Sequence, residues 1–345
     1  MAITLKDVAA AVGVSISTVS QVLRNAENTW ISEATKERVR QTARDLGYRA
    51  NPAARLLSSR KGHFFAIVIR QFRSMILLEP IRRVTNKAIE AGYTPFVVES
   101  IDLPMSHYDN VESLADAVVF IGTDGKEFCA RIEQLTSGIA TVVATNPINS
   151  RFPEFIWEEA LGFGLVLDHL LELGHCNIAL LGGDRTDRAG NPTRLRQYQD
   201  ACEQRGMKPL IIVSEVEEDF IHSGQKMARE LLATHPEITA VVGRNIEFSV
   251  GALSEFQRQG LQVPRDLSLV SYTDDRIAKG VWPPLTALHT PIEKAADLAV
   301  ETALQMLEGK TVDHGPTVLP VKLIVRESTG PPRNCNLPTD RSVSN

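Results

Sequence analysis

Residues 4–24 read TLKDVAAAVGVSISTVSQVLR, and this stretch decides the fold of the N-terminal region. Thr4 precedes Asp7 by three residues, which is the spacing of a capping box and predicts the start of a first helix. Gly13 permits a tight turn, and Ser15 can cap a second helix. The order helix, glycine turn, helix predicts a helix-turn-helix. The side chains expected to face outward from the second helix are Ile16, Ser17, Ser20, Gln21 and Arg24.

A third helix and the local charge extend this interpretation. Ser32 can cap the helix, apolar residues recur at Val39, Ala43 and Leu46, and Gly47 can end it. Residues 1–60 have a net charge of +4, whereas the whole chain has −5. A basic head on an acidic body favours binding of a polyanion at the N-terminus. The alternative at this point is a small helical hairpin with no role in DNA binding.

The motifs TLKDVA at 4–9, GVS at 13–15, TVS at 18–20 and GYRANPAAR at 47–55 resemble the lactose-repressor family of bacterial transcription regulators. The resemblance continues to about Arg326. It implies that the second helix reads bases in double-stranded operator DNA. It also implies a hinge helix that folds only on DNA, with Leu57 wedged into the minor groove and Ala54 beside it. The implied DNA-binding residues are Thr4, Ser15, Ile16, Ser17, Ser20, Gln21, Arg24, Asn51, Ala54, Arg55 and Leu57.

One reading position departs from the family pattern. Members usually carry Arg after the Thr-Val-Ser run, whereas this chain has Gln21. Arg pairs with guanine O6 and N7, and Gln can pair with adenine N6 and N7, so we expect a changed base in each half-site. Ile16 suits contact with a thymine methyl group. The alternative is that Gln21 contacts only phosphate, since at least half of protein–DNA hydrogen bonds go to the backbone.

Composition limits the class of protein. With 345 residues, 43% hydrophobic and 23% charged, the chain has room for a small head and two larger lobes. The four cysteines form no Cys-x-x-Cys pair, which predicts neither disulfides nor a zinc site. No apolar run approaches the ~20 residues of a membrane span, and no signal segment is recognisable. We therefore expect a cytoplasmic protein with no membrane association.

Signals for an enzyme are weak. Gly162 and Gly164 lack the third glycine of a dinucleotide-binding loop, and Gly182-Gly183 is not followed by the Lys-Ser or Lys-Thr of a phosphate loop. The eight histidines show no paired metal spacing. We expect no catalytic residue, no metal and no cofactor. An α/β enzyme, or a cytoplasmic small-molecule-binding protein without DNA function, remains the alternative.

From Gly62 onward, short β-rich runs alternate with amphipathic helices, which predicts two series of parallel strands. The expected fold is a small all-α helix-turn-helix head joined to an α/β two-lobed core, which the resemblance identifies as periplasmic-binding-protein-like. The expected boundaries are 1–49 for the head, 50–61 for the hinge helix, 62–330 for the core and 331–345 for a disordered tail. Within the core, the first lobe takes about 62–157 and 289–312, and the second about 158–288 and 313–328.

A ligand site is expected between the lobes, at the carboxyl ends of the strands. Ile246 and Thr273 replace two acids that the family usually has there, and this argues against a simple sugar. Arg70, Arg73 and Arg194 would favour an anion. Two alternatives are that Arg70 and Arg73 are solvated loop charges, and that the cleft binds nothing. The effector-binding residues expected are Arg70, Phe72, Arg194, Phe220, Asn245 and Thr273.

Together these observations predict a transcription regulator, and more specifically a repressor, under allosteric control by a small molecule. Dimerisation is expected because one short recognition helix reads few base pairs and a homodimer matches a palindromic operator. Whether the effector induces or co-represses stays open at this point.

Overall fold

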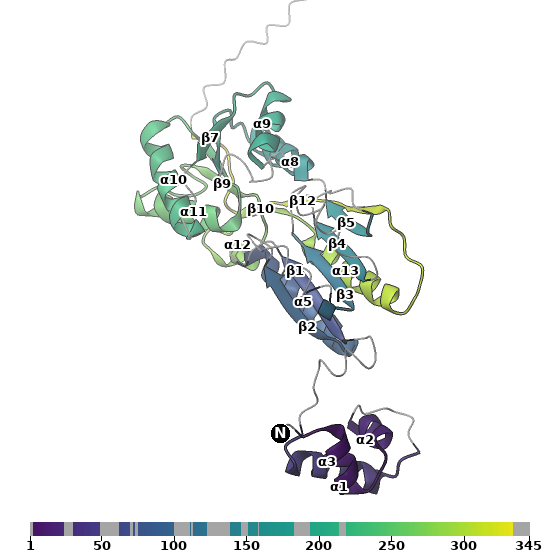
Figure 1. The fold of residues 1–345 in the computed structure, drawn as a ribbon. Helices are drawn as coiled ribbons and strands as arrows, with labels where there is room; N and C mark the ends of the chain where they lie inside the picture. The colour runs from purple at the N-terminus through teal and green to yellow at the C-terminus, as the bar shows by residue number, and fades with distance from the viewer. Residues whose placement is uncertain are drawn as a thin grey trace, which may run out of the picture. The chain divides into compact units, whose positions relative to one another are not determined.

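A computed structural model describes most of the chain (Figure 1), in two compact units that comprise Met1–Gly62 and His63–Asn345 and are treated separately below. The described residues are 3–23, 30–48, 62–69, 72, 75–99, 111, 113–122, 139–145, 151–157, 159–182, 194–213 and 219–333.

The first unit contains the predicted helices α1 (Leu5–Val12), α2 (Ile16–Leu23) and α3 (Glu33–Asp45). The capping box of α1 is confirmed, since the Thr4 N–H donates to the Asp7 carboxylate at 2.8 Å. Gly13 ends α1 with φ of 76°, a conformation that glycine adopts without strain. The three helices share one core, whose buried members are Val8, Ala9, Val12, Val19, Val22, Val39 and Ala43.

The remaining caps also follow the sequence. Ser15 accepts the Thr18 N–H at 3.0 Å, and Ser32 accepts the Thr35 N–H at 3.3 Å. One expectation was wrong: Leu46 is 37% exposed and does not belong to this core. It lies at the C-cap of α3, and Tyr48, two residues later, packs against this core instead.

The described residues of the second unit form two six-stranded sheets. All strand pairs of the first sheet are parallel, in the order β11-β5-β4-β3-β1-β2. Its strands are β1 (Phe64–Ile69), β2 (Thr94–Glu99), β3 (Ala117–Ile121), β4 (Ala140–Thr145), β5 (Glu154–Trp157) and β11 (Pro316–Leu319).

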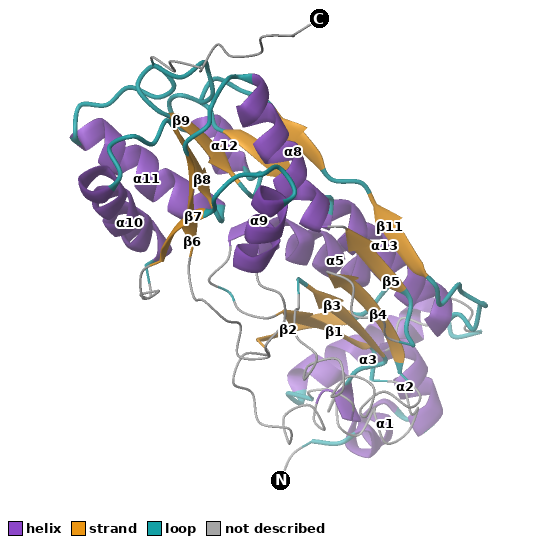
Figure 2. Cartoon of the chain, turned by 90° about the horizontal axis from the view of Figure 1, so that it is seen from above, coloured by secondary structure: helices purple, strands orange, loops and turns teal. Residues whose placement is uncertain are grey.

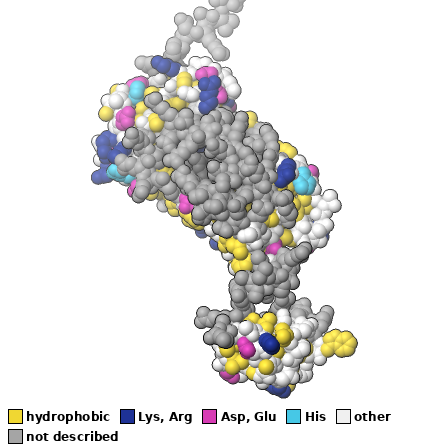
Figure 3. Space-filling view, in the orientation of Figure 1, with side chains coloured by type: hydrophobic (Ala, Val, Ile, Leu, Met, Phe, Trp, Pro, Cys, Tyr) yellow, Lys and Arg dark blue, Asp and Glu magenta, His cyan; other side chains and the backbone are white. Residues whose placement is uncertain are grey.

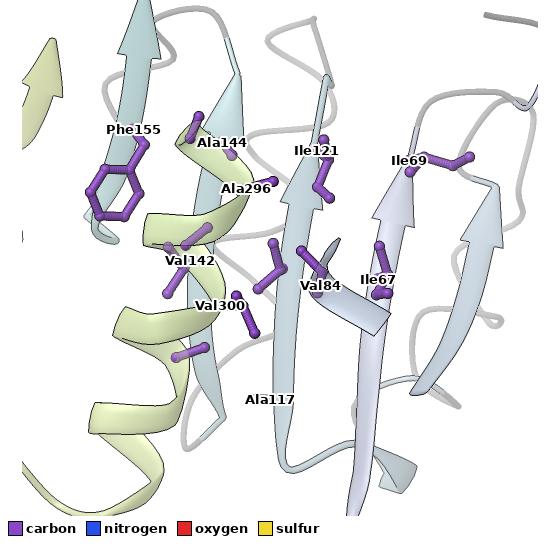
Figure 4. Packing of buried hydrophobic residues seen from close by; sticks show 14 of the residues in the cluster. Ile67, Ile69, Val84, Ala117, Ile121, Val142, Ala144, Phe155, Ala296 and Val300 are labelled. Atoms are coloured by element: carbon purple, nitrogen blue, oxygen red, sulfur yellow. The ribbon is translucent and has the colours of Figure 1, made fainter. Parts of the chain in front are cut away.

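Two helices cover one face of this sheet, α5 (Leu78–Glu90), which follows the short 3-10 helix η1 (Met75–Leu77), and α13 (Ile292–Leu307). In Figure 4, Val84 of α5 and Ala296 and Val300 of α13 face strand residues such as Ile121 and Val142. Parallel strands buried on both faces read as continuous apolar runs, which explains the sequence of β3.

The second sheet has the order β12-β10-β9-β8-β6-β7, and only the β10–β12 pair is antiparallel. Its strands are β6 (Ile178–Gly182), β7 (Leu210–Val213), β8 (Ala240–Gly243), β9 (Ser268–Ser271), β10 (Thr286–His289) and β12 (Lys322–Ile324). The helices are α8 (Glu159–Glu172), α9 (Arg194–Glu203), α10 (Phe220–Thr234), α11 (Ile246–Arg258) and the short α12 (Arg276–Gly280).

These helices divide between the two faces of the second sheet. Figure 2 shows α10 and α11 on one side and α8 and α9 on the other, and each pair has its own hydrophobic core. Glycines bring α10 and α11 close together: a Cβ on Gly251 would overlap the Ile221 carbonyl oxygen, and one on Gly224 would overlap Phe248. The approach of these two backbones therefore requires glycine at both positions.

The division of the C-terminal segment differs from the expectation. Residues 313–328 were assigned to the second lobe, but β11 pairs in parallel with β5, Pro316 opposite Glu154, and so belongs to the first sheet. Pro320, which has no N–H to donate, separates β11 from β12. The sequence reads as one apolar stretch here, and nothing in it indicates that β5 is the partner of β11.

The start of the expected tail is also more ordered than predicted. The Gly330 carbonyl accepts from buried His175 at 2.8 Å, and Arg333 pairs with Asp266, so the packed chain reaches residue 333. The rest of the tail, 334–345, lies outside the described residues. Among the described helices, each is too short or too polar to cross a bilayer.

Candidate functional site

The outward face of α2 carries the predicted DNA-reading side chains. Ile16 is 48% exposed, Ser17 and Gln21 are exposed, and Ser20 is half-buried. Val19 and Val22, on the other side of the same helix, are buried. The helix therefore exposes a few polar and apolar side chains to solvent, while its opposite side packs into the hydrophobic core of the head.

Two other predicted DNA contacts have structural partners in the head. The Ser15 hydroxyl caps α2 and lies 2.8 Å from the Thr18 hydroxyl. The Thr4 hydroxyl donates to Asp7 at 2.7 Å. The backbone N–H of Thr4, followed by its hydroxyl, holds the pKa of Asp7 below its usual value. Thr4 and Ser15 are exposed, and the hydroxyl of each also stabilises the start of a helix.

The basic residues of the head are partly committed to the head itself. Arg38 of α3 donates to the Val12 carbonyl at 2.7 Å, at the C-terminal end of α1, where a cation is favourable. Lys36 pairs with Glu33 at 2.6 Å, and Arg44 pairs with Glu37 at 3.0 Å. Figure 3 shows charged and hydrophobic side chains interspersed on the drawn face of the head. Net charge alone therefore overstates how many cations are available to phosphate.

Several predicted residues cannot be located. Arg24, the hinge residues Asn51, Ala54, Arg55 and Leu57, and Arg70 of the expected cleft lie outside the described residues, as does Arg73.

In the second lobe, the structure brings three predicted effector residues to one edge of the sheet. Arg194 begins α9, and its Nη1 donates to the Arg244 carbonyl at 3.1 Å, directly after β8. Asn245, the next residue, caps α11 by accepting the Phe248 N–H at 2.8 Å. Thr273, only 3% exposed, follows β9 and accepts the Ile246 N–H at 2.8 Å. The carboxyl ends of β8 and β9 therefore meet here, as parallel strands require.

The two predicted phenylalanines lie elsewhere in this unit. Phe220 begins α10 and packs edge-on against Phe248, with ring centroids 5.5 Å apart. Phe72 is exposed in the first lobe, and its N–H donates to Glu99 at 3.1 Å. The described contacts connect Phe220 to α11, but not Phe72.

Sequence reasoning missed the aromatic support of this edge. Arg194 lies over the Tyr272 ring at 5.3 Å, and Tyr272 stacks on Phe163 at 3.8 Å. Arg244 lies over Phe248 at 5.4 Å. Such cation–π contacts orient a guanidinium without neutralising it. The available signal was an arginine followed by an aromatic residue one helical turn later, which is too common to identify Arg244.

Asp274 is a structural residue rather than an exposed carboxylate. It accepts from Arg326 at 2.7 Å and lies 3.8 Å from His289. Burial acts to raise the pKa of Asp274, but His289 and Arg326 together hold it below its usual value. Asp274 therefore links the end of β9 to β10 through His289 and to the segment after β12 through Arg326. Among the described residues, no group of His, Cys, Asp or Glu side chains could hold a metal ion.

Two family descriptions match separate parts of the chain. Residues 4–51 match "Bacterial regulatory proteins, lacI family", and residues 167–329 match "Periplasmic binding protein-like domain". The HTH-type transcriptional regulator DegA of Bacillus subtilis (strain 168) is 27% identical over 96% of this chain and 99% of its own. The ribose operon repressor of Escherichia coli (strain K12) is 27% identical over 90% of this chain and 95% of its own.

Solved structures show the same fold. The lac repressor dimer bound to operator and the anti-inducer ONPF has a TM-score of 0.76 at 22% identity, covering 96% of this chain and 100% of that one. A lacI-family protein from Silicibacter pomeroyi has a TM-score of 0.79 at 20% identity, covering 95% and 99%. The head thus matches the lacI-family description, most of the second unit from residue 167 onward matches the periplasmic binding protein-like domain, and transcription regulators align with this chain along nearly its full length.

Proposed function

We propose that this protein is a transcriptional repressor that binds a palindromic DNA operator as a homodimer and responds to a small molecule held between the lobes. The observation that carries the proposal is the outward face of α2, where Ile16, Ser17 and Gln21 are exposed on a helix whose other side is buried. Such a helix can enter the major groove with its core intact.

The choice of bases follows from these side chains. The Gln21 amide can both donate and accept, which matches adenine N6 and N7, and Ile16 can contact a thymine methyl group. An operator with an A·T pair at the Gln21 position of each half-site is therefore the expected target. The hinge at 50–61, with Leu57 as a minor-groove wedge, is part of this proposal and is supported by the family resemblance.

The homodimer is supported by geometry and by relatives. One eight-residue recognition helix contacts only a few base pairs, so two copies related by a two-fold axis are needed to specify a site. The lac repressor, which shares this fold, is a dimer bound to operator in a solved structure. A ribose operon repressor among the relatives supports repression rather than activation.

The effector site is proposed at the edge formed by Arg194, Asn245 and Thr273. The Thr273 hydroxyl already accepts a backbone N–H, and Ile246 is apolar, so neither offers the carboxylate that would bind two sugar hydroxyls. We therefore expect a ligand other than a simple sugar. The head, the core and the relatives also favour a cytoplasmic regulator over an enzyme, since the relatives described above are transcription regulators.

The test is selection of binding sites from random double-stranded DNA by the full-length protein, with and without a metabolite extract. The proposal expects a palindromic consensus, and an extract-dependent change in recovery. As a control, Gln21→Ala should retain non-specific binding and lose the preference at one symmetric position. If no duplex sequence is enriched by a correctly folded dimer, the protein is not a sequence-specific regulator.

A further inference from the structure

A buried carboxylate lies where the two lobes meet. Glu247 occupies the first turn of α11 in the second lobe and is only 6% exposed. Its Oε1 accepts the N–H of Met75, which begins η1 in the first lobe, at 2.9 Å. The two residues are 172 positions apart in the chain. One hydrogen bond therefore fixes the start of a first-lobe helix against the start of a second-lobe helix.

The surroundings make this contact consequential. Burial raises the pKa of Glu247, while the Met75 N–H and the Glu247 N–H lower it. The charged groups that act on it most are Asp275, at the start of α12, and Arg194 of α9. The Glu247 carboxylate is buried and has lost most of its solvation, so separating it from the Met75 N–H without admitting water leaves a buried acceptor unsatisfied.

A second interlobe contact provides a comparison. Arg276 of α12 lies 3.8 Å from Glu79 of α5, but the Arg276 side chain is 83% exposed. Glu79 also has ion-pair partners on its own helix, Arg82 and Arg83. Exposed ion pairs contribute little because water and salt compete with them. Of these two described contacts across the lobes, the buried one should dominate.

Glu247 is also next to the ligand site. Asn245 caps α11, Ile246 donates its N–H to Thr273, and Glu247 follows in the same helical turn. Helix α11 is held rigidly against α10 by the close approach at Gly224 and Gly251. A shift of this turn by a ligand would therefore move the Glu247 carboxylate relative to Met75.

We propose that Glu247 is an interlobe latch, whose bond to the Met75 amide holds the lobes in one arrangement and whose release couples the ligand site to movement of the lobes. The coupling to ligand rests on the proposed function, whereas the latch itself depends only on the core. A ligand can shift such an equilibrium only through different affinities for the two arrangements.

Hydrogen–deuterium exchange at the Met75 amide tests the latch in the full-length protein without DNA or ligand. Glu247→Ala removes the acceptor and should speed this exchange by about tenfold or more. Glu247→Gln keeps an oxygen acceptor without the charge and should speed it less, by about threefold. Arg276→Ala is the matched control, an interlobe contact in solvent, and should leave the rate unchanged. Amides of buried strand β6 should be unaffected in every variant.

The latch is refuted if either Glu247 variant exchanges Met75 at the wild-type rate, or if Arg276→Ala speeds exchange equally. If the alanine variant does not fold, the glutamine variant decides, since it preserves shape and an acceptor. A negative result here leaves DNA binding untouched. Conversely, failure to select an operator would leave the exchange result standing, so the two proposals fail independently.

Discussion

The head and the proposed ligand-site edge of the second lobe place their polar groups in opposite ways. On α2, the proposed reading side chains face solvent, and the caps join residues only three positions apart, as Ser15 and Thr18 do. At the edge of the second sheet, Arg194 reaches a carbonyl 50 positions away, and Thr273 accepts an N–H 27 positions away. A change of an exposed reading side chain on α2 should therefore alter recognition alone, whereas a change at the edge should alter packing as well.

The largest expected effect is on the core. Gly251→Val places a side chain against the Ile221 carbonyl oxygen and the backbone of Gly224, where α10 and α11 touch. Overpacking of this kind usually costs about 1–3 kcal/mol, and we expect about 3 kcal/mol or more because backbone rather than a flexible side chain is in the way. Calorimetry should show a lower transition temperature for the core.

Gly280→Ala is the control for this substitution, since a Cβ there meets open space. It should change stability by well under 1 kcal/mol. If Gly251→Val also unfolds the three-helix head, the two units are not independent and the contrast between them is incorrect.

The second prediction concerns recognition. Gln21→Arg should move the preferred base from adenine towards guanine at one symmetric position, with a discrimination of about 1–3 kcal/mol. Because Gln21 is exposed, thermal stability should stay within about 0.5 kcal/mol of the wild type. Site selection combined with melting measures both quantities. An unchanged consensus would assign Gln21 to the phosphate backbone instead.

The third prediction tests how the head is held together. Arg38→Met removes the guanidinium that donates to the Val12 carbonyl, while keeping a long apolar stem. We expect the head to lose about 1–2 kcal/mol, because a charged donor at a helix C-terminus is lost. When the full-length variant is unfolded in urea, the midpoint of unfolding should fall for the head and stay unchanged for the core. An equal loss in Lys6→Met, which removes an exposed cation of α1, would instead indicate a general charge effect.

The smallest effect is a pH dependence at the edge of the second lobe. The folded-state pKa of Asp274 is lowered, so its pairing stabilises the core above the ordinary carboxyl value of 3.8 and is lost as pH falls further. Asp274→Asn should be less stable near neutrality, and its stability should fall less steeply below pH of about 4. Denaturant titrations at several pH values give both slopes. Parallel slopes would mean that other carboxylates dominate acid unfolding.

The sequence predicted the head better than the core for a physical reason. The caps at Thr4, Ser15 and Ser32 and the exposure of Ile16 and Gln21 depend on neighbours within one helical turn. In the core, the alternation of β-rich runs with amphipathic helices predicted two series of parallel strands. The assignment of β11 was wrong because strand membership depends on a distant partner, here β5.

The proposed ligand-site edge shows the same limit. The proximity of Arg194, Asn245 and Thr273 could be expected from strand ends, but their bonds could not. Arg244, Tyr272 and Glu247 were missed because their significance comes from rings and amides that the fold brings near.

The adjacent strands β11 and β12 have a consequence for how the protein is made. Each is the outermost strand of a different sheet, and only Pro320 and Val321 separate them. During translation, neither sheet can acquire its final edge until residues 316–324 have left the ribosome. A nascent chain that stops before residue 316 would display the bare edges of β5 and β10 together, so premature termination should yield an aggregation-prone product rather than a usable half.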